Sequence, residues 1–182
     1  MFIAIIILQS FVPFLGNLPL FILDITIIHI TVIVGGIVLG PKAGFLLGFA
    51  WGFSSFLRAF TSGNAVTFMI FTNPFISILP RLLMGGLIAL FYHKMSKVIT
   101  YDKLRMALSG FLGSLMNTIL VLGLIYLLMA GQYAELTGKT VAELPIVLMG
   151  IVMSNGIAEA IAASIMTPII ASVLLSVSKK RG

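Results

Sequence analysis

The sequence predicts an all-α membrane protein, a bundle of six transmembrane helices that forms a single domain over residues 1–182. Mean hydropathy is +1.20, and only 9% of the residues are charged, far below the roughly 25% of soluble domains. Six apolar stretches can be placed along the chain, and a helix crosses a bilayer with about 20 apolar residues. Once these stretches alternate across the membrane, most Lys and Arg residues fall on one side of it.

Glycine, proline and asparagine mark the breaks between the predicted spans. The first span ends at Gly16-Asn17, the second at Gly40-Pro41, and the fourth begins after Asn73 with Pro74, a residue favoured in the first turn of a helix. The predicted spans are residues 2–15, 24–39, 43–60, 74–92, 104–129 and 144–177.

The predicted loops differ in character. A polar connector at 61–64 is followed by the apolar stretch 66–71, which we expect to lie at the membrane interface. The loop 93–103 is charged, and the loop 131–143 is polar. The sixth span is long enough to tilt or kink, and it contains Pro168.

The cations set the expected orientation. One side of the alternating spans holds Lys42, Lys94, Lys97, Lys103, Arg105, Lys179, Lys180 and Arg181. The opposite side holds Lys139 and, at its edge, Arg58, whereas Arg81 lies within the fourth span. Because short cytoplasmic loops carry the excess of Lys and Arg, we expect both termini in the cytoplasm and the loops after spans one, three and five outside.

Glycines recur every four residues from the second span into the third, at Gly36, Gly40, Gly44, Gly48 and Gly52. Small residues let helices approach closely in lipid, where packing rather than hydrophobic burial drives association. We expect the last three to form a structural seam inside the bundle. The alternative is a sliding surface for a partner protein.

Several function classes are disfavoured. The chain has no Cys, which excludes disulfides, thiolate metal sites and cysteine nucleophiles. Its two histidines, His29 and His93, cannot hold a metal alone, so we expect neither metal nor cofactor. The cations gather at membrane edges, which argues against nucleic acid as a partner. The sequence has no GxxxxGK[ST] phosphate loop, so energy for uphill transport would come from another chain. We also expect no cleavable signal peptide, because no basic residues precede the first apolar stretch.

Arg81 is the first candidate for function, because an ionisable group within a span is costly and usually has a partner or a task. It lies seven residues after Pro74, about 10 Å below the outer start of that helix. A guanidinium there could hold a carboxylate at the floor of an outward pocket. Alternatively, Arg81 could reach the outer interface or pair with Asp24 or Glu159.

The next candidates are Asn155, Glu159 and Asn117. Asn155 and Glu159 are four residues apart and share a helical face, and buried amides and carboxylates need hydrogen-bond partners. Asn117 shares a face with Gly110 and Gly113. Together with Arg81, these residues indicate a small polar-ligand site on spans four to six; the alternative is hydrogen bonding between helices.

Other polar and aromatic residues have weaker claims. Trp51 and Tyr126 could stack on a ligand or could simply pack. Asn64 and Asn73 flank the second outward loop, where they could form a lid or serve as turn residues. We expect His29 and Gln9 to hydrogen-bond between spans.

The stretches FVPFLGNLPL (11–20) and DITIIHITVIVGGIVLGPKAGFLLGFAWGFSSF (24–56), the later NP and PRLLMGG elements and the asparagine of span six resemble the S components of energy-coupling factor (ECF) vitamin transporters. The resemblance covers essentially the whole chain. Within that family the chain is most similar to the pantothenate-specific members.

The resemblance implies a bacterial cell-membrane protein that binds a water-soluble vitamin at its outer face. The S component then topples as it docks to a membrane scaffold subunit, EcfT, which two cytoplasmic ATPases drive. Family members pack an AxxxA motif of span one on the scaffold. Ala4 would be its second alanine, and the first would precede Met1, so we expect either residues before Met1 or a degenerate motif.

The family pocket carries over to Arg81, Asn117 and Asn155, and further to Glu159, Asn73 and Trp51. Arg81 would hold the carboxylate of pantothenate, and the asparagines would bind its hydroxyl and amide groups. The alternatives are an S component for niacin, folate, pyridoxine or a thiamine precursor, or a structural membrane subunit without transport. An intramembrane enzyme is the least favoured, because the sequence shows no nucleophile–base pair or metal set.

Overall fold

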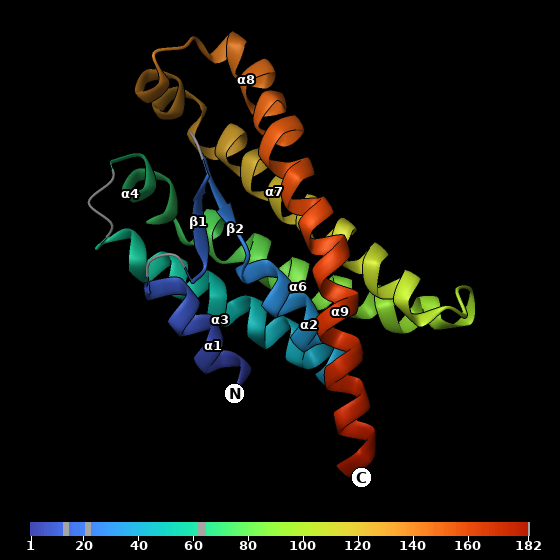
Figure 1. The fold of residues 1–182 in the computed structure, drawn as a ribbon. Helices are drawn as coiled ribbons and strands as arrows, with labels where there is room; N and C mark the ends of the chain where they lie inside the picture. The colour runs from blue at the N-terminus through green and yellow to red at the C-terminus, as the bar shows by residue number, and fades with distance from the viewer. Residues whose placement is uncertain (13–14, 21–22, 62–64, 182) are drawn as a thin grey trace.

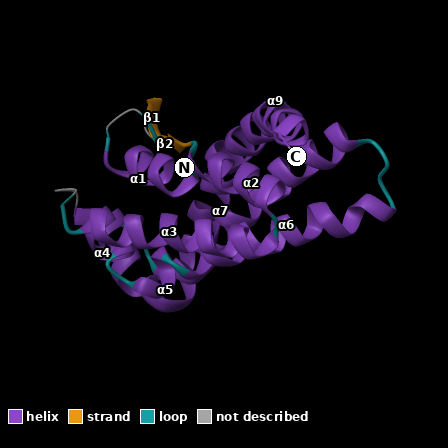
Figure 2. Cartoon of the chain, turned by 90° about the horizontal axis from the view of Figure 1, so that it is seen from below, coloured by secondary structure: helices purple, strands orange, loops and turns teal. Residues whose placement is uncertain are grey.

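The computed structural model describes residues 1–12, 15–20, 23–61 and 65–181, and the side chains within 17–25 and 179–181 are not described. Asn64 and the side chain of Asp24 therefore lie outside the described part. The chain is almost entirely helical (Figures 1 and 2). Its elements are α1 (Phe2–Phe11), β1 (Asn17–Leu20), β2 (Leu23–Thr26), α2 (Ile28–Leu39), α3 (Pro41–Ala59), α4 (Ala65–Phe71), α5 (Pro74–Ser77), α6 (Leu79–Lys94), α7 (Asp102–Thr137), α8 (Leu144–Ile151), the π-helical segment η3 (Val152–Gly156) and α9 (Ile157–Arg181), with short 3-10 turns at Met95–Lys97 and Val141–Glu143.

A small hairpin replaces the predicted turn before the second span. The prediction that this span starts at Asp24 is wrong, because β1 and β2 pair antiparallel with Pro19 opposite Asp24. The backbone N–H of Ile27 then donates to the Gly16 carbonyl at 2.9 Å, and α2 starts one residue later. The predicted end of span one at Leu15 is also wrong. Val12, the residue before a proline, is extended at φ −90° and ψ 120°, as that position favours.

Pro80 divides the predicted fourth span into α5 and α6. Proline has no N–H and its ring crowds the carbonyl four residues earlier, which here belongs to Ile76. The two helices accordingly meet at Ile78 rather than forming one continuous helix over 74–92. The carbonyl of Ile76 instead accepts a hydrogen bond of 2.6 Å from Nη1 of Arg81.

The last two predicted spans have different limits in the structure. Helix α7 continues through most of the expected polar loop to Thr137, with a local distortion at Met129 (φ −139°, ψ 22°), so a loop over 131–137 is wrong. Gly138 ends the helix in the left-handed region at φ 64°, as is common after a helix C-terminus. The expected span 144–177 is α8 and α9 joined by η3, and Pro168 lies inside α9.

Length and composition identify membrane-crossing candidates within the described residues. Three helical stretches, Pro74–Lys97, Asp102–Thr137 and Val141–Ser178, are long and apolar enough to cross a bilayer. Phe2–Phe11 and Ile28–Leu39 are shorter apolar helices. An all-α membrane protein is thus confirmed, whereas the count of six spans stays a prediction.

Helix α2 is the centre of the packing. Nine of its twelve residues are buried, and it contacts α1, α3, α6, α7 and α9. A helix that is apolar all round belongs inside a bundle. Around it lies a first core cluster, which includes Ile33, Trp51 and Met84. A second cluster joins α4, α5, α7 and α8 through residues such as Ile76 and Val121.

The glycine seam predicted for the third span is confirmed. A Cβ at Gly44 would lie 2.3 Å from the carbonyl oxygen of Gly85, and one at Gly48 would lie 2.1 Å from that of Arg81. At Gly52 it would meet the Cα of Ile78 at 2.7 Å. Helix α3 therefore packs backbone to backbone on α6. Gly40 has a different task, because its φ of 94° makes the sharp junction between α2 and α3.

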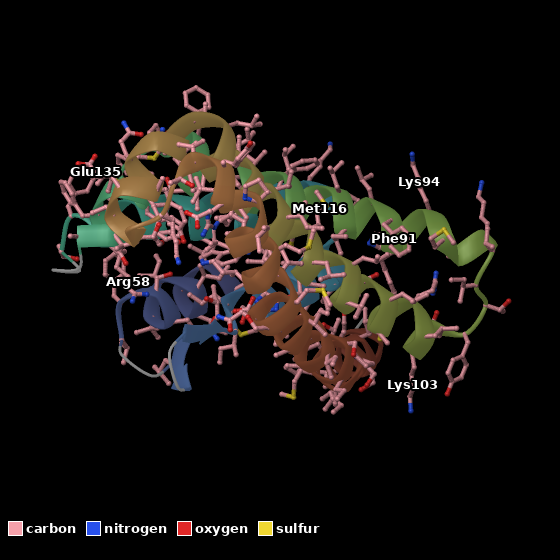
Figure 3. The ribbon with its side chains drawn as sticks, turned by 90° about the horizontal axis from the view of Figure 1, so that it is seen from above. Arg58, Phe91, Lys94, Lys103, Met116 and Glu135 are labelled. Carbon is pink, nitrogen blue, oxygen red and sulfur yellow. The ribbon has the colours of Figure 1, made fainter. Side chains whose placement is uncertain are left out.

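The charged residues separate along the long axis of the bundle. Lys94 and Lys103 lie at one end, near the connection from α6 to α7, whereas Arg58 and Glu135 lie at the opposite end (Figure 3). The connection from α6 to α7 therefore lies at the end of the bundle opposite Arg58 and Glu135.

Candidate functional site

Arg81 lies at the junction of the two core clusters, at the start of α6. Its side chain is buried, with 6% of the residue exposed. The guanidinium carbon lies 5.3 Å from the centre of the Trp51 ring and 4.9 Å from that of Phe71. Two aromatic faces from α3 and α4 thus hold the cation, an arrangement that gains strength when water is excluded.

Local sequence explains this placement. Gly48 lets α3 approach the backbone of Arg81, and Trp51, almost one turn further along α3, then covers the guanidinium. Because Pro80 has no N–H, the carbonyl of Ile76 is available to accept a hydrogen bond from Nη1 of Arg81. Nε of Arg81 is buried and has no hydrogen-bond partner within the described ranges. Since a guanidinium has five N–H donors, it retains donors for a ligand.

Glu159 lies in the first turn of α9 and is 8% exposed. Its Oε1 accepts a hydrogen bond of 2.8 Å from the backbone N–H of Thr26, at the end of β2. Its charge also attracts that of Arg81, although no ion pair joins the two among the described residues. Glu159 therefore fastens the hairpin to α9 and places a carboxyl group near Arg81.

Asn117 lies on α7 at the level of Arg81, because Gly113 of α7 and Gly85 of α6, each one turn away, both contact α2. We call this level of the bundle the site layer. It is 9% exposed, and its Oδ1 is buried without a partner in the described part of the chain. A Cβ on Gly113, one turn earlier, would meet side chains of Ile33 and Ile88 at 2.7 Å and 3.3 Å. Asn117 thus lies one turn beyond a contact with α2 and α6.

Two further buried groups belong to this layer. His29 is four residues before Ile33 on α2, which runs opposite to α7, so it lies on the same side of that contact as Asn117. Its Nε2 and the Oγ of Ser114 are both buried without described partners. Such orphaned groups are uncommon in folded proteins. The sequence suggested His29 for bonding between spans, and it did not single out Ser114 or Phe71.

Asn155 lies in η3, which faces α7. A Cβ on the adjacent Gly156 would meet the methyl group of Thr118, the neighbour of Asn117, at 3.2 Å. Asn155 is half-buried, and the structure places it at the level of Asn117. Single π-helical turns are frequent at functional sites, and this irregularity was not visible in the sequence.

Four other residues that the sequence singled out are Asn73, Gln9, Tyr126 and Ala4. Oδ1 of Asn73 accepts the Phe75 N–H at 3.0 Å and so caps α5. Thr31 donates to Oε1 of Gln9 at 2.9 Å, which confirms that Gln9 bonds between helices. Tyr126 is 40% exposed, and Ala4 is exposed on α1.

The arrangement suits an anion with polar substituents. A buried guanidinium with spare donors can hold a carboxylate through charge-assisted hydrogen bonds. The neighbouring amide and hydroxyl groups can both donate and accept. Trp51 and Phe71 restrict water around the charge, which makes its interactions stronger than in solvent.

Comparison with known proteins assigns the chain to a protein family. The family model described as "ECF transporter, substrate-specific component" matches residues 1–171. The chain belongs to this family. It is 32% identical over 188 residues to "Pantothenate transporter PanT" of Leuconostoc mesenteroides subsp. mesenteroides, covering 100% of this chain and 92% of the relative. It is 33% identical over 190 residues to "Pantothenic acid transporter PanT" of Lactococcus lactis subsp. cremoris, covering 95% of this chain and 89% of that relative.

Membership fixes the general role of the chain. As a substrate-specific component of an ECF transporter, it is a multi-pass protein of the bacterial cell membrane and part of a transport system rather than an enzyme. The resemblance noted in the sequence is thereby confirmed. The roles of the individual site residues stay predictions.

Proposed function

We propose that this chain captures pantothenate at its outward end and delivers it to an ECF transport module. The observation that carries the proposal is the match to a pantothenate transporter along the entire chain. The geometry supports it, because pantothenate has one carboxylate for Arg81 and hydroxyl and amide groups for Asn117 and Asn155. S components for niacin, folate, pyridoxine or a thiamine precursor are the alternatives that a binding test separates.

The proposed topology is one membrane domain over residues 1–182 with six crossings and cytoplasmic termini. Supporting it, Lys94 and Lys103 lie at one end of the bundle and Arg58 and Glu135 at the other. The positive-inside rule then puts the end with Lys94 and Lys103 in the cytoplasm. The site layer lies toward the opposite, outward end, where an extracellular vitamin arrives.

The proposed partners are the scaffold subunit EcfT and two cytoplasmic ATPases, which supply the energy for toppling. The exposed face of α1 supports a docking role, because Ala4 lies there among exposed apolar side chains such as Ile3 and Ile7. A small residue between larger ones permits close helix approach.

Fluorescence of Trp51 tests the ligand directly, because it is the sole Trp of the chain and lies against the Arg81 guanidinium. We expect pantothenate to change this emission saturably, and panthenol, which has an alcohol in place of the carboxylate, to bind much more weakly. A Trp51→Phe variant controls for signal from impurities. A response to another vitamin but not to pantothenate contradicts the proposed substrate.

Arg81→Ala tests the anion site. Removing one partner of a buried charge pair costs about 2–5 kcal/mol, so pantothenate affinity by calorimetry should fall by about 30-fold to about 4,000-fold. The affinity of Arg81→Lys for pantothenate should fall less, because lysine keeps the positive charge although it lacks the planar guanidinium. Unchanged affinity in a folded Arg81→Ala protein removes this residue from the site.

A further inference from the structure

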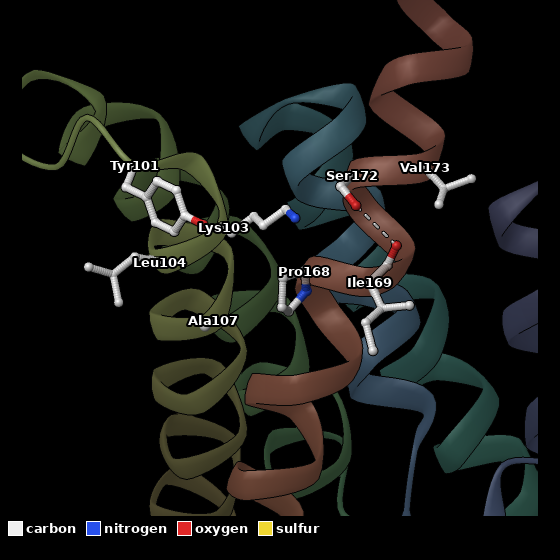
Figure 4. Close-up of a pocket in the computed structure, with 8 residues that line it drawn as sticks. All are labelled: Tyr101, Lys103, Leu104, Ala107, Pro168, Ile169, Ser172 and Val173. Carbon is white, nitrogen blue, oxygen red and sulfur yellow. Dashed lines mark hydrogen bonds between the residues drawn. The ribbon is translucent and has the colours of Figure 1, made fainter.

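A groove lies between α7 and α9, at the end of the bundle away from the site layer. Its volume is about 760 Å³, within the range of about 300–1,000 Å³ that small-molecule sites occupy. Figure 4 shows the residues that line it: Tyr101, Lys103, Leu104, Ala107, Pro168, Ile169, Ser172 and Val173. None of the residues that the sequence suggested for vitamin binding is among them.

The packing of the two helices explains the groove. They touch closely at Gly110, where a Cβ would lie 2.3 Å from the Ala163 carbonyl oxygen. One turn further toward this end, small Ala107 faces Pro168, so neither helix fills the space between them. Exposed apolar side chains, including Leu104 and Val173, then form the walls.

The groove is apolar along its walls and charged at its mouth. Ser172 donates its hydroxyl hydrogen to the Ile169 carbonyl of its own helix at 3.2 Å, so that polar group is already satisfied. Lys103 carries the charge among the lining residues, and its side chain extends from α7 across toward α9 (Figure 4). The acidic neighbour Asp102 is paired with Arg105, which offsets its negative charge.

We propose that this groove binds one anionic phospholipid, with an acyl chain along the apolar walls and the headgroup phosphate at Lys103. Charge complementarity selects this occupant, because an apolar body with one anionic end matches an apolar wall with one cationic end. A free anion leaves the apolar walls unused, and a zwitterionic lipid such as phosphatidylcholine brings its choline cation near the lysine together with its phosphate. The mouth also lies at the first turn of α7, where backbone N–H groups carry partial positive charge. Basic pockets between membrane helices bind anionic headgroups in this way.

Native mass spectrometry of the full chain, released from detergent with added lipid, tests the proposal. Phosphatidylglycerol and phosphatidylcholine with identical acyl chains are the two probes. We expect the wild-type protein to retain one phosphatidylglycerol about five-fold more strongly than phosphatidylcholine, the factor expected for one lysine near an anionic surface. Lys103→Ala should abolish that preference. The matched control is Lys97→Ala, which removes an exposed cation at the same end but outside the groove lining.

A second variant tests the apolar part. Ala107→Phe fills the groove and should lower retention of both lipids, with Ala107→Leu as a milder filling should the larger residue prevent folding. Equal retention of the two lipids by the wild-type protein overturns the proposal, as does a Lys97→Ala effect equal to that of Lys103→Ala. Retention of neither lipid, the result expected for a groove that a partner helix fills, overturns it as well. The result does not depend on which vitamin the chain binds.

Discussion

Gly48→Ala is the perturbation that most directly tests how the α3–α6 seam supports the site. An added Cβ would lie 2.1 Å from the carbonyl oxygen of Arg81 and 3.0 Å from the Cα of Leu82. Ordinary contact begins at about 3.4 Å, so the helices must separate by about 1.3 Å. Both neighbours are backbone atoms, which cannot rotate away as a side chain can.

The expected magnitude follows from two opposing effects. Overpacking of this kind costs about 1–3 kcal/mol, whereas replacing a helical glycine with alanine gains up to about 1 kcal/mol. Because the clash is with backbone, we expect the upper part of the overpacking range, about 2–3 kcal/mol, which leaves a net loss of about 1–2 kcal/mol. For a chain of this size the Tm should fall by about 2–8 °C.

The assay is thermal unfolding of the purified protein, with and without pantothenate. Gly123→Ala is the matched control, because Gly123 lies in α7 and a Cβ there meets nothing within 4 Å. That control should raise the Tm slightly. Gly48→Ala should also weaken pantothenate binding, because it shifts the backbone of Arg81. A Gly48→Ala protein as stable as Gly123→Ala would refute the reasoning about the seam.

Three more predictions concern single polar side chains. Glu159→Ala should speed amide hydrogen exchange at Thr26, because that N–H loses a carboxyl acceptor whose hydrogen bond is worth about 0.5–3 kcal/mol. Glu159→Gln should restore part of the protection, and equal exchange in the wild-type protein and both variants contradicts the assigned contact. Asn117→Ala should lower pantothenate affinity about ten-fold or more with little change in Tm, since its Oδ1 has no described partner to lose. Asn73→Ala should lower the Tm, because α5 loses a helix cap worth about 1 kcal/mol, and should leave pantothenate affinity unchanged. A loss of affinity at unchanged Tm would show that Asn73 binds the ligand.

The boundaries that the sequence predicted well are those that glycine and proline impose locally. The junction at Gly40-Pro41 is where α2 gives way to α3, because glycine supplies a positive φ and proline suits the start of a helix. The hairpin was missed for the opposite reason. Its residues are apolar enough to be taken for the start of a span. Their backbone hydrogen bonds are made between β1 and β2 rather than within a helix, and composition does not reveal that pairing.

The site shows the same division. The cost of an ionisable group in lipid identifies Arg81 from the sequence alone, and the membrane class follows from composition. Phe71, however, comes from a short helix 10 residues away along the chain, and Ser114 is an ordinary helical residue until its hydroxyl is buried without a described partner.

Hydropathy, charge distribution and motif resemblance by themselves determined that this chain is a helical membrane protein of the ECF substrate-binding family, because those properties add up residue by residue. Only the tertiary structure decided that Arg81 donates to the carbonyl freed by Pro80, that Glu159 holds Thr26, and that α7 and α9 part below Gly110. These contacts depend on how close separate helices come. That distance is set by the side chains meeting across the bundle, which no local pattern records.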